Sequence, residues 1–202
     1  MKKPALFCIL LALMATSVMA DEPTQATDNQ PAANDTMSNQ PISCAYKIPP
    51  EKTDIDTSIV QSWAKYATVK SFDMDAASLD QQMNSLKECF TKQGWEGYQN
   101  ALEKSGNLNA IKTQKLTVSS QVDGDVQINP AKTNQWKVTL PVEVVYQNDK
   151  QKLTQLLSVD VLVGRKVSGD LGIMQLIATP RVAGESKSSS ASTEEPTSKE
   201  SN

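Results

Sequence analysis

Residues 136–146 read Trp-Lys-Val-Thr-Leu-Pro-Val-Glu-Val-Val-Tyr, and this stretch decides the fold of the chain. Apolar side chains occupy every even-numbered position from Trp136 to Tyr146, while the odd-numbered positions are mainly polar. Since successive side chains of a β-strand point to opposite faces, this alternation predicts an antiparallel strand that buries one face. Proline has no backbone N–H to donate to a neighbouring strand, so Pro141 predicts that the strand lies at a sheet edge or carries a bulge.

Further strands are predicted on both sides of this stretch. Residues 153–163 alternate in the same way after a turn at 148–151, and residues 171–178 favour a last strand. Residues 116–128 are rich in Val, Thr and Ser and favour a strand in which Asp123-Gly124 forms a bulge or a turn. The second half of the chain therefore predicts a curved, four-stranded antiparallel sheet.

The first half of the chain has helical periodicity instead. Apolar residues recur at spacings of three and four in three segments, at residues 55–66, 79–90 and 95–102. Asp54 is a plausible N-cap of the first helix, and Gly106 a C-cap of the third, with a possible extra turn at 107–111. We therefore expect an α+β domain with three N-terminal helices packed on one face of the sheet.

The two ends of the chain differ from this central block. Two lysines, a short apolar run and a final Val-Met-Ala predict a secretory signal peptide over residues 1–20. The alternative is an uncleaved anchor, for which the run is short against the roughly 20 residues of a spanning helix. Residues 21–42 and 182–202 are polar and predict a flexible leader and a disordered, Ser-rich tail around one domain at residues 43–181.

Two cysteines remain after signal cleavage, Cys44 and Cys89. Export places the chain in an oxidising compartment, where an even pair favours a disulfide bond. The alternative is two unpaired cysteines that are buried as small apolar residues. We expect the bond, which would join the segment before the first helix to the end of the second.

The sequence offers little to catalysis. It contains no histidine, which removes Ser-His and Cys-His nucleophile pairs and the usual zinc ligand sets, and its net charge of −3 does not favour nucleic-acid binding. We therefore expect no catalytic residue, no metal ligand and no cofactor. Three aspartate pairs fit caps and turns better than acid–base chemistry: Asp54/Asp56, Asp73/Asp75 and Asp123/Asp125. Three tryptophans fit the core better than a ligand slot: Trp63, Trp95 and Trp136.

Two stretches resemble a known family. Two motifs of the IcmL/DotI family resemble these stretches. One is similar to residues 89–95, Cys-Phe-Thr-Lys-Gln-Gly-Trp, and the other to residues 101–108, Ala-Leu-Glu-Lys-Ser-Gly-Asn-Leu. Trp63-Ala64 in the first helix and the strands that follow resemble the family as well. The resemblance covers residues 58–178 and rests on a long colinear match, without a catalytic signature.

The resemblance implies a component of the type IVB (Dot/Icm) secretion apparatus or of a related conjugation system. It implies a periplasmic domain of the VirB-type, nuclear-transport-factor-like fold, which acts as a non-enzymatic scaffold and contacts itself or other apparatus subunits. Family members carry a transmembrane helix before this domain. This chain is instead expected to carry a cleaved signal, which predicts a soluble periplasmic relative with no stable membrane insertion.

We expect the protein to act through its sheet. The strand at residues 136–146 is interpreted as an edge strand, and we expect a contact with another chain along this strand or along the outer helix face. Glu143 and Val145, on the outward face of the strand, are the candidate contact residues. An alternative function is an exported small-ligand-binding protein or enzyme that uses a pocket of the same fold. A third is an exported, host-facing protein with the Ser-rich tail as a recognition segment.

Overall fold

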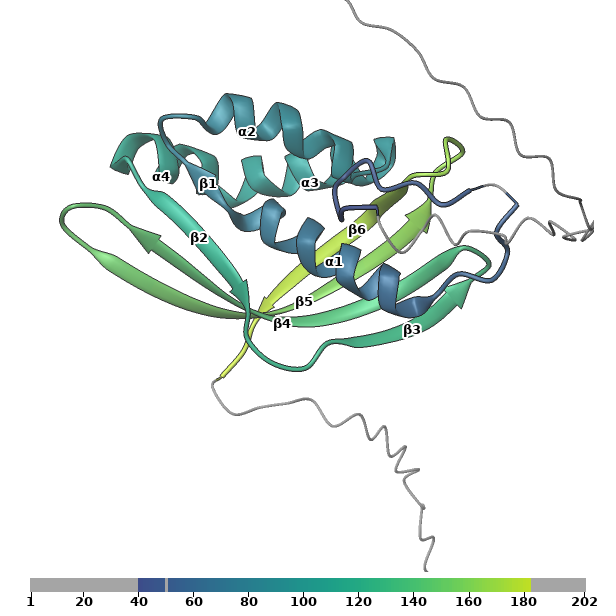
Figure 1. Cartoon of the computed structure of the whole chain (residues 1–202). Coiled ribbons are helices and arrows are strands. Elements are labelled where there is room, and N and C mark those ends of the chain that lie inside the picture. Colours follow the sequence, from purple (N-terminus) through teal and green to yellow (C-terminus); the bar gives the residue numbers. More distant parts are fainter. Residues whose placement is uncertain (1–39, 50, 183–202) are drawn as a thin grey trace, which may run out of the picture. The chain divides into compact units, whose positions relative to one another are not determined.

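The computed structural model describes residues 40–49 and 51–182, which exclude the predicted signal peptide, most of the leader and the tail after Val182. In these residues, helices cover one face of a sheet whose strands are all antiparallel to their neighbours (Figure 1). The helical elements come first in the chain: α1 (Thr57–Phe72), α2 (Leu79–Leu86), the 3-10 helix η1 (Lys87–Cys89), α3 (Lys92–Ser105) and α4 (Asn107–Gln114). The strands are β1 (Met74–Asp75), β2 (Thr117–Val122), β3 (Gln127–Lys132), β4 (Gln135–Gln147), β5 (Lys152–Arg165) and β6 (Leu171–Pro180). The α+β class with N-terminal helices on a curved sheet is confirmed.

The sheet is larger than predicted. Its strands follow the order β1-β2-β4-β5-β6, and β3 pairs with β4 beside β2, which makes six strands in the described residues. The predicted strand at 116–128 is two strands, because the chain turns away from β4 after Val122 and returns to it at Gln127. Asp123-Gly124 lies in this break, and Gly124 has a positive φ of 135° that glycine tolerates.

The prediction that residues 136–146 form an edge strand is wrong. β4 pairs with β5 along its whole length and with β2 and β3 on its other side. Pro141 lies opposite the break between β2 and β3, where its carbonyl accepts a hydrogen bond from the Asp123 N–H at 2.9 Å. Because N and C=O of one strand residue point to the same side, the Pro141 nitrogen faces this break, where no ladder bond is lost.

The helices also differ in detail from the prediction. Asp56, not Asp54, caps α1, since its carboxylate accepts from the Ser58 N–H at 2.8 Å. Gly106 ends α3 in the left-handed conformation at φ 72°, as predicted. The residues after it form a full helix, α4, rather than a single turn, so the described residues contain four α-helices and not three.

The core lies between the helices and the inner face of the sheet. Trp63 of α1 is fully buried there, and Trp95 and Trp136 are buried as well, which confirms their core role. The inner face of the long hairpin supplies the other large share of the core, through Val138, Leu140, Val142, Val144, Leu157, Val159, Val161 and Val163. Phe90, Trp95 and Tyr98 form an aromatic cluster with ring centroids 4.8–5.8 Å apart.

Candidate functional site

The candidate contact residues Glu143 and Val145 alternate along β4 with the fully buried Val142 and Val144, so they lie on the outer face of the sheet, away from the helices. Both are half-buried, and they stand beside Gln121 and Ser119 of β2 and beside Leu156 and Thr154 of β5. The Gln121 side-chain amide donates to the Glu143 carboxylate at 3.3 Å. Because β4 is an interior strand, these residues can offer side chains to a partner but no free backbone groups.

The rest of the outer face combines polar groups with partly exposed apolar side chains. Asp160 of β5 accepts from Thr139 Oγ1 at 2.6 Å and pairs with the Lys137 ammonium at 3.2 Å. Leu156 and Leu162 are half-buried, and Ile177 of β6 is 48% exposed. A mixed surface of this kind is suited to protein contact, in which apolar side chains lie among polar neighbours.

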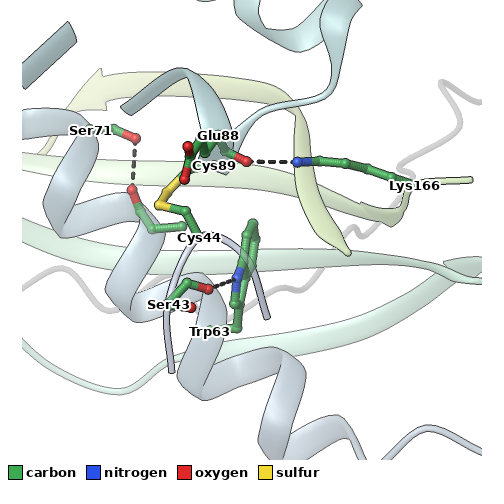
Figure 2. Close-up of a disulfide and its surroundings, with 8 residues drawn as sticks. Ser43, Cys44, Trp63, Ser71, Glu88, Cys89 and Lys166 are labelled. Carbon is green, nitrogen blue, oxygen red and sulfur yellow. Dashed lines mark hydrogen bonds between the residues drawn. A yellow bond between two sulfur atoms is a disulfide. The ribbon is translucent and has the colours of Figure 1, made fainter. Parts of the chain in front are cut away.

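A disulfide joins the segment before α1 to η1, as the sequence predicted (Figure 2). The Cα atoms of Cys44 and Cys89 are 4.4 Å apart, and Cys89 is fully buried. Next to the bond, the Trp63 indole Nε1–H donates to the Ser43 carbonyl at 2.9 Å. The disulfide and the hydrogen bond from Trp63 together hold the segment before α1 against the core.

Arg165 holds the same segment from the other side, a role that sequence reasoning missed. At the end of β5, its guanidinium donates to the carbonyls of Ile48 at 2.7 Å and Lys52 at 3.2 Å, and also to that of Pro49. Backbone bonds add to these contacts, from Leu171 N–H to the Tyr46 carbonyl and from Ile48 N–H to the Gly169 carbonyl. We call residues 43–49 and 51–52 the N-terminal clasp.

Lys166 is a neighbouring cation that is tied to η1. Its ammonium donates to the Glu88 carbonyl at 2.6 Å, as Figure 2 shows. Partial burial lowers the pKa of Lys166, because it disfavours the charged form, and Asp170 and Glu88 partly offset that effect. Lys166 therefore fastens the loop after β5 to the disulfide-bonded turn.

One member or both of each aspartate pair makes structural contacts, although these are not all the caps and turns that the sequence predicted. Asp73 accepts from the N–H and the hydroxyl of Ser120, which joins the end of α1 to β2. Asp75 accepts from Thr117 Oγ1 and the Ala77 N–H, and these bonds lower its pKa. Asp123 pairs with Arg181. In the part of the chain that the structure describes, no three potential ligands from Cys, Asp and Glu gather to hold a metal.

A groove lies between α4 and the far end of the β4–β5 hairpin. Its volume is about 250 Å³. Five of its lining side chains are apolar or aromatic: Ala110, Ile111, Leu116, Tyr146 and Leu153. The other four carry amides: Asn107, Gln114, Gln151 and Gln155. Burial raises the pKa of Tyr146, so its hydroxyl stays neutral at physiological pH. The sequence did not indicate this groove.

No helix among residues 40–49 and 51–182 combines the length and the apolar character that a membrane crossing needs. The predicted signal peptide lies outside these residues.

Solved structures with the same arrangement of helices and sheet come from bacterial secretion systems. An IcmL-like type IV secretion protein from Legionella pneumophila is 21% identical, with a TM-score of 0.61 over 63% of this chain and 95% of that one. The periplasmic domain of DotI is 27% identical, with a TM-score of 0.59 over 63% of this chain and 98% of the other. CagV of Helicobacter pylori, a VirB8 homologue, is 10% identical with a TM-score of 0.53 over 62% and 99% of the two chains. The VirB8-type fold is thereby confirmed.

The class of protein is therefore a type IV secretion component, and its described part corresponds to the periplasmic domain of such components. The sequence profile of one family, described as a type-IV b secretion system, inner-membrane complex component, matches residues 45–180. The chain belongs to this DotI/IcmL family, as the resemblance implied. No sequence among curated proteins matches the chain significantly.

Proposed function

We propose that the protein is a periplasmic, non-enzymatic scaffold of a type IVb secretion apparatus or a related conjugation system. In this proposal it contacts a second copy of itself or another apparatus subunit through the outer face of its sheet, around Glu143 and Val145. The family supports the setting, because its members are components of an inner-membrane complex. It acts by holding partners in place.

One observation carries the choice of surface. The helices all cover the inner face of the sheet, while the outer face leaves apolar side chains partly exposed across two adjacent strands and β6, at Val145, Leu156, Leu162 and Ile177. Partly exposed apolar groups among polar ones gain free energy when a partner removes them from water. The outer face can make this contact without any change in the buried core.

The test is a pair of substitutions on this face, Glu143→Lys and Val145→Asp. Both side chains are half-buried and point away from the core, so the domain should stay folded by circular dichroism. Association of the full chain, measured by analytical ultracentrifugation and by crosslinking mass spectrometry in the native bacterium, should weaken by about tenfold or more. The control is Gln93→Lys with Glu96→Lys on the exposed side of α3, which should leave association unchanged. Equal association of both variants and the wild type refutes the proposal.

The proposed location rests on the signal peptide over residues 1–20. Cleavage after Ala20 should release a protein that partitions with the periplasmic fraction. Intact mass of the protein purified from its native bacterium decides this point. A mass that still includes Met1, together with recovery from the membrane pellet, requires an anchored protein instead.

A further inference from the structure

The groove beside α4 lies where β5 extends beyond its neighbour β6. The last backbone bond between the two strands runs from the Arg181 N–H to the Leu156 carbonyl at 3.0 Å. Residues 152–155 of β5 pair with β4 on one side and, among the described residues, with no strand on the other. An open strand edge therefore borders the groove.

Thr154 presents the free backbone groups of this edge. The Pro141 carbonyl points away from β5, toward Asp123, so the next residue, Val142, exchanges hydrogen bonds with Leu157. Bonded and non-bonded pairs alternate along an antiparallel ladder, which makes Val145 and Thr154 a non-bonded pair. The N–H and C=O of Thr154 therefore face outward, where an added strand could bond them.

The side chains on either side of Thr154 belong to the groove. Leu153 and Gln155 both line it and lie on the helix-facing side of the sheet, opposite Tyr146 and Val144. Leu153 is 63% exposed, although it is a large apolar residue on the face that is buried elsewhere in the sheet. A strand bonded to Thr154 would place alternate side chains over this apolar surface.

The groove is held open by contacts between the hairpin and α4. Asn148 Nδ2 donates to the Gln114 carbonyl at 2.8 Å, and Gln151 Nε2 donates to Gln114 Oε1 at 2.9 Å. Asn148 Oδ1 also accepts the N–H groups of Lys150 and Gln151 and fixes the turn. A surface that is ordered before binding loses less entropy when a partner arrives.

The volume of the groove and the charged residues near it indicate which kind of partner it can bind. The volume of about 250 Å³ is below the roughly 300–1,000 Å³ of small-molecule pockets and fits one or two side chains. No charged residue lines the groove, but exposed lysines adjoin its lining residues in the sequence, at Lys115, Lys150 and Lys152, and Asp149 lies in the same turn. A further neighbour in the sequence, Lys112, is already paired with Asp80. This balance favours an acidic partner around an apolar side chain.

We propose that the groove and the β5 edge at residues 152–155 bind an extended segment of another protein. The segment adds a short strand next to Thr154, packs an apolar side chain against Leu153 at the side of the groove, and carries acidic residues that face Lys150 and Lys152. The groove lies on the helix-facing side of the sheet, whereas the side chains of Glu143 and Val145 lie on the outer face; the two surfaces come nearest at Thr154, which is paired with Val145. The proposal does not depend on the function proposed for the outer face.

The experiment uses the mature full-length chain as bait for a displayed library of random 12-residue peptides. Enriched peptides should carry an apolar residue with acidic residues on its flanks. Their affinity, measured by fluorescence polarisation, should fall by about tenfold or more in Leu153→Asp and in Thr154→Pro. Thr154→Pro removes an outward-facing N–H only, a change that an edge strand tolerates.

Matched controls repeat each change away from the groove. Ala178→Pro removes an N–H that the same alternation places on the outer edge of β6, and Ile177→Asp adds a charge to an exposed apolar position of that strand. Both controls, and Glu143→Lys on the outer face, should bind the enriched peptides like wild type. Lys150→Glu/Lys152→Glu should lower the affinity for the peptides and should also reduce how strongly that affinity falls with added salt.

Three results overturn the proposal. The first is a selection that enriches the same peptides on the Leu153→Asp/Thr154→Pro double variant as on wild type, or none on either. The second is equal loss of affinity in the Ala178→Pro or Ile177→Asp control. The third is peptide binding that appears only when the chain is shortened to end at Val182, because the tail of the chain itself would then be the occupant.

Discussion

The Asp123 N–H donates to the Pro141 carbonyl at 2.9 Å, at the point where the neighbour of β4 changes from β2 to β3. This bond explains how a proline sits in the middle of the sheet. The position that would lack a ladder donor faces a connection between two strands instead of a strand. The long β4–β5 hairpin can thereby pair with two short strands, β2 and β3, one after the other along the free side of β4.

We predict that two glycines of α3 respond in opposite ways to alanine. A Cβ at Gly94 would lie 2.1 Å from the Ile173 carbonyl oxygen, so α3 would have to move off β6. Gly94→Ala should lower the free energy of unfolding by about 3 kcal/mol or more. A Cβ at Gly97 meets nothing within 4 Å, so Gly97→Ala should raise it by about 0.5–1 kcal/mol through helix propensity. Urea unfolding measures both, and equal effects of the two substitutions would contradict the close approach of α3 to β6.

The disulfide is predicted to contribute substantially to stability. It closes a loop between positions 45 residues apart, which restricts the unfolded chain by about 4 kcal/mol on the entropy model. Cys44→Ser/Cys89→Ser should lower the free energy of unfolding by a similar amount, and dithiothreitol should do the same to wild type but not to the variant. An unchanged urea midpoint in reducing buffer would show that the bond is not formed in solution.

Arg165 is predicted to hold the N-terminal clasp through its planar guanidinium. Lysine keeps the charge but lacks the planar guanidinium that donates to all three carbonyls. Arg165→Lys should therefore lower the free energy of unfolding by about 1–3 kcal/mol. Hydrogen exchange should accelerate at the Ile48 N–H, which bonds the Gly169 carbonyl. Lys137→Arg on the outer face serves as the control, and protection of Ile48 equal to wild type in Arg165→Lys would argue against this role.

Tyrosine ionisation is predicted to destabilise the fold in base. Burial raises the pKa of Tyr98 far above its ordinary 10.0, and burial also raises the pKa values of Tyr46 and Tyr146. A pKa that is higher in the folded state gives stability that is complete below pH 10.0 and is lost as pH rises above it. Lys166 acts in the opposite direction. Its pKa is lowered in the folded state, so its contribution to the free energy of unfolding increases as pH rises toward 10.5 and the ammonium loses its proton.

The check is the urea midpoint from pH 8 to pH 11 in wild type and in Tyr98→Phe. Tyr98→Phe loses the hydrogen bond from the tyrosine hydroxyl to the Ser71 carbonyl, so it should be less stable at pH 8 by about 1–2 kcal/mol. It should also lose stability less steeply above pH 10, and parallel curves for the two proteins would refute the assignment to Tyr98.

Local patterns predicted the parts of this fold that depend on one segment at a time. The alternation from Trp136 to Tyr146 was sufficient to predict the strand and its buried face. The expected oxidising compartment and the two remaining cysteines were sufficient to predict the disulfide. The break after Val122 was not predictable in the same way, since Asp123-Gly124 fits a bulge within one strand as well as a turn between two. Only the pairing with β4 separates these readings.

The candidate binding sites were harder to predict because they depend on where strands end relative to each other. Pro141 was read as a sign of an edge, whereas the open edge is at Thr154, where β6 stops before β5 does. Arg165 could not be assigned to its three carbonyls, since they lie more than 110 residues earlier in the chain. Glu143 and Val145 remain a prediction about a partner.

The N-terminal clasp determines how this domain would bear mechanical load. A pull on the chain ahead of Ser43 meets the hydrogen bond from Trp63 and then Cys44, where it passes through a covalent bond into η1, whose next residue, Phe90, bridges to Ile173 of β6. The covalent route delivers the tension to the sheet, while α1 is joined to Ser43 only through the side chain of Trp63 and is not pulled from its first turn. A domain attached in this way can serve as an anchor point that resists traction while its helices stay in place.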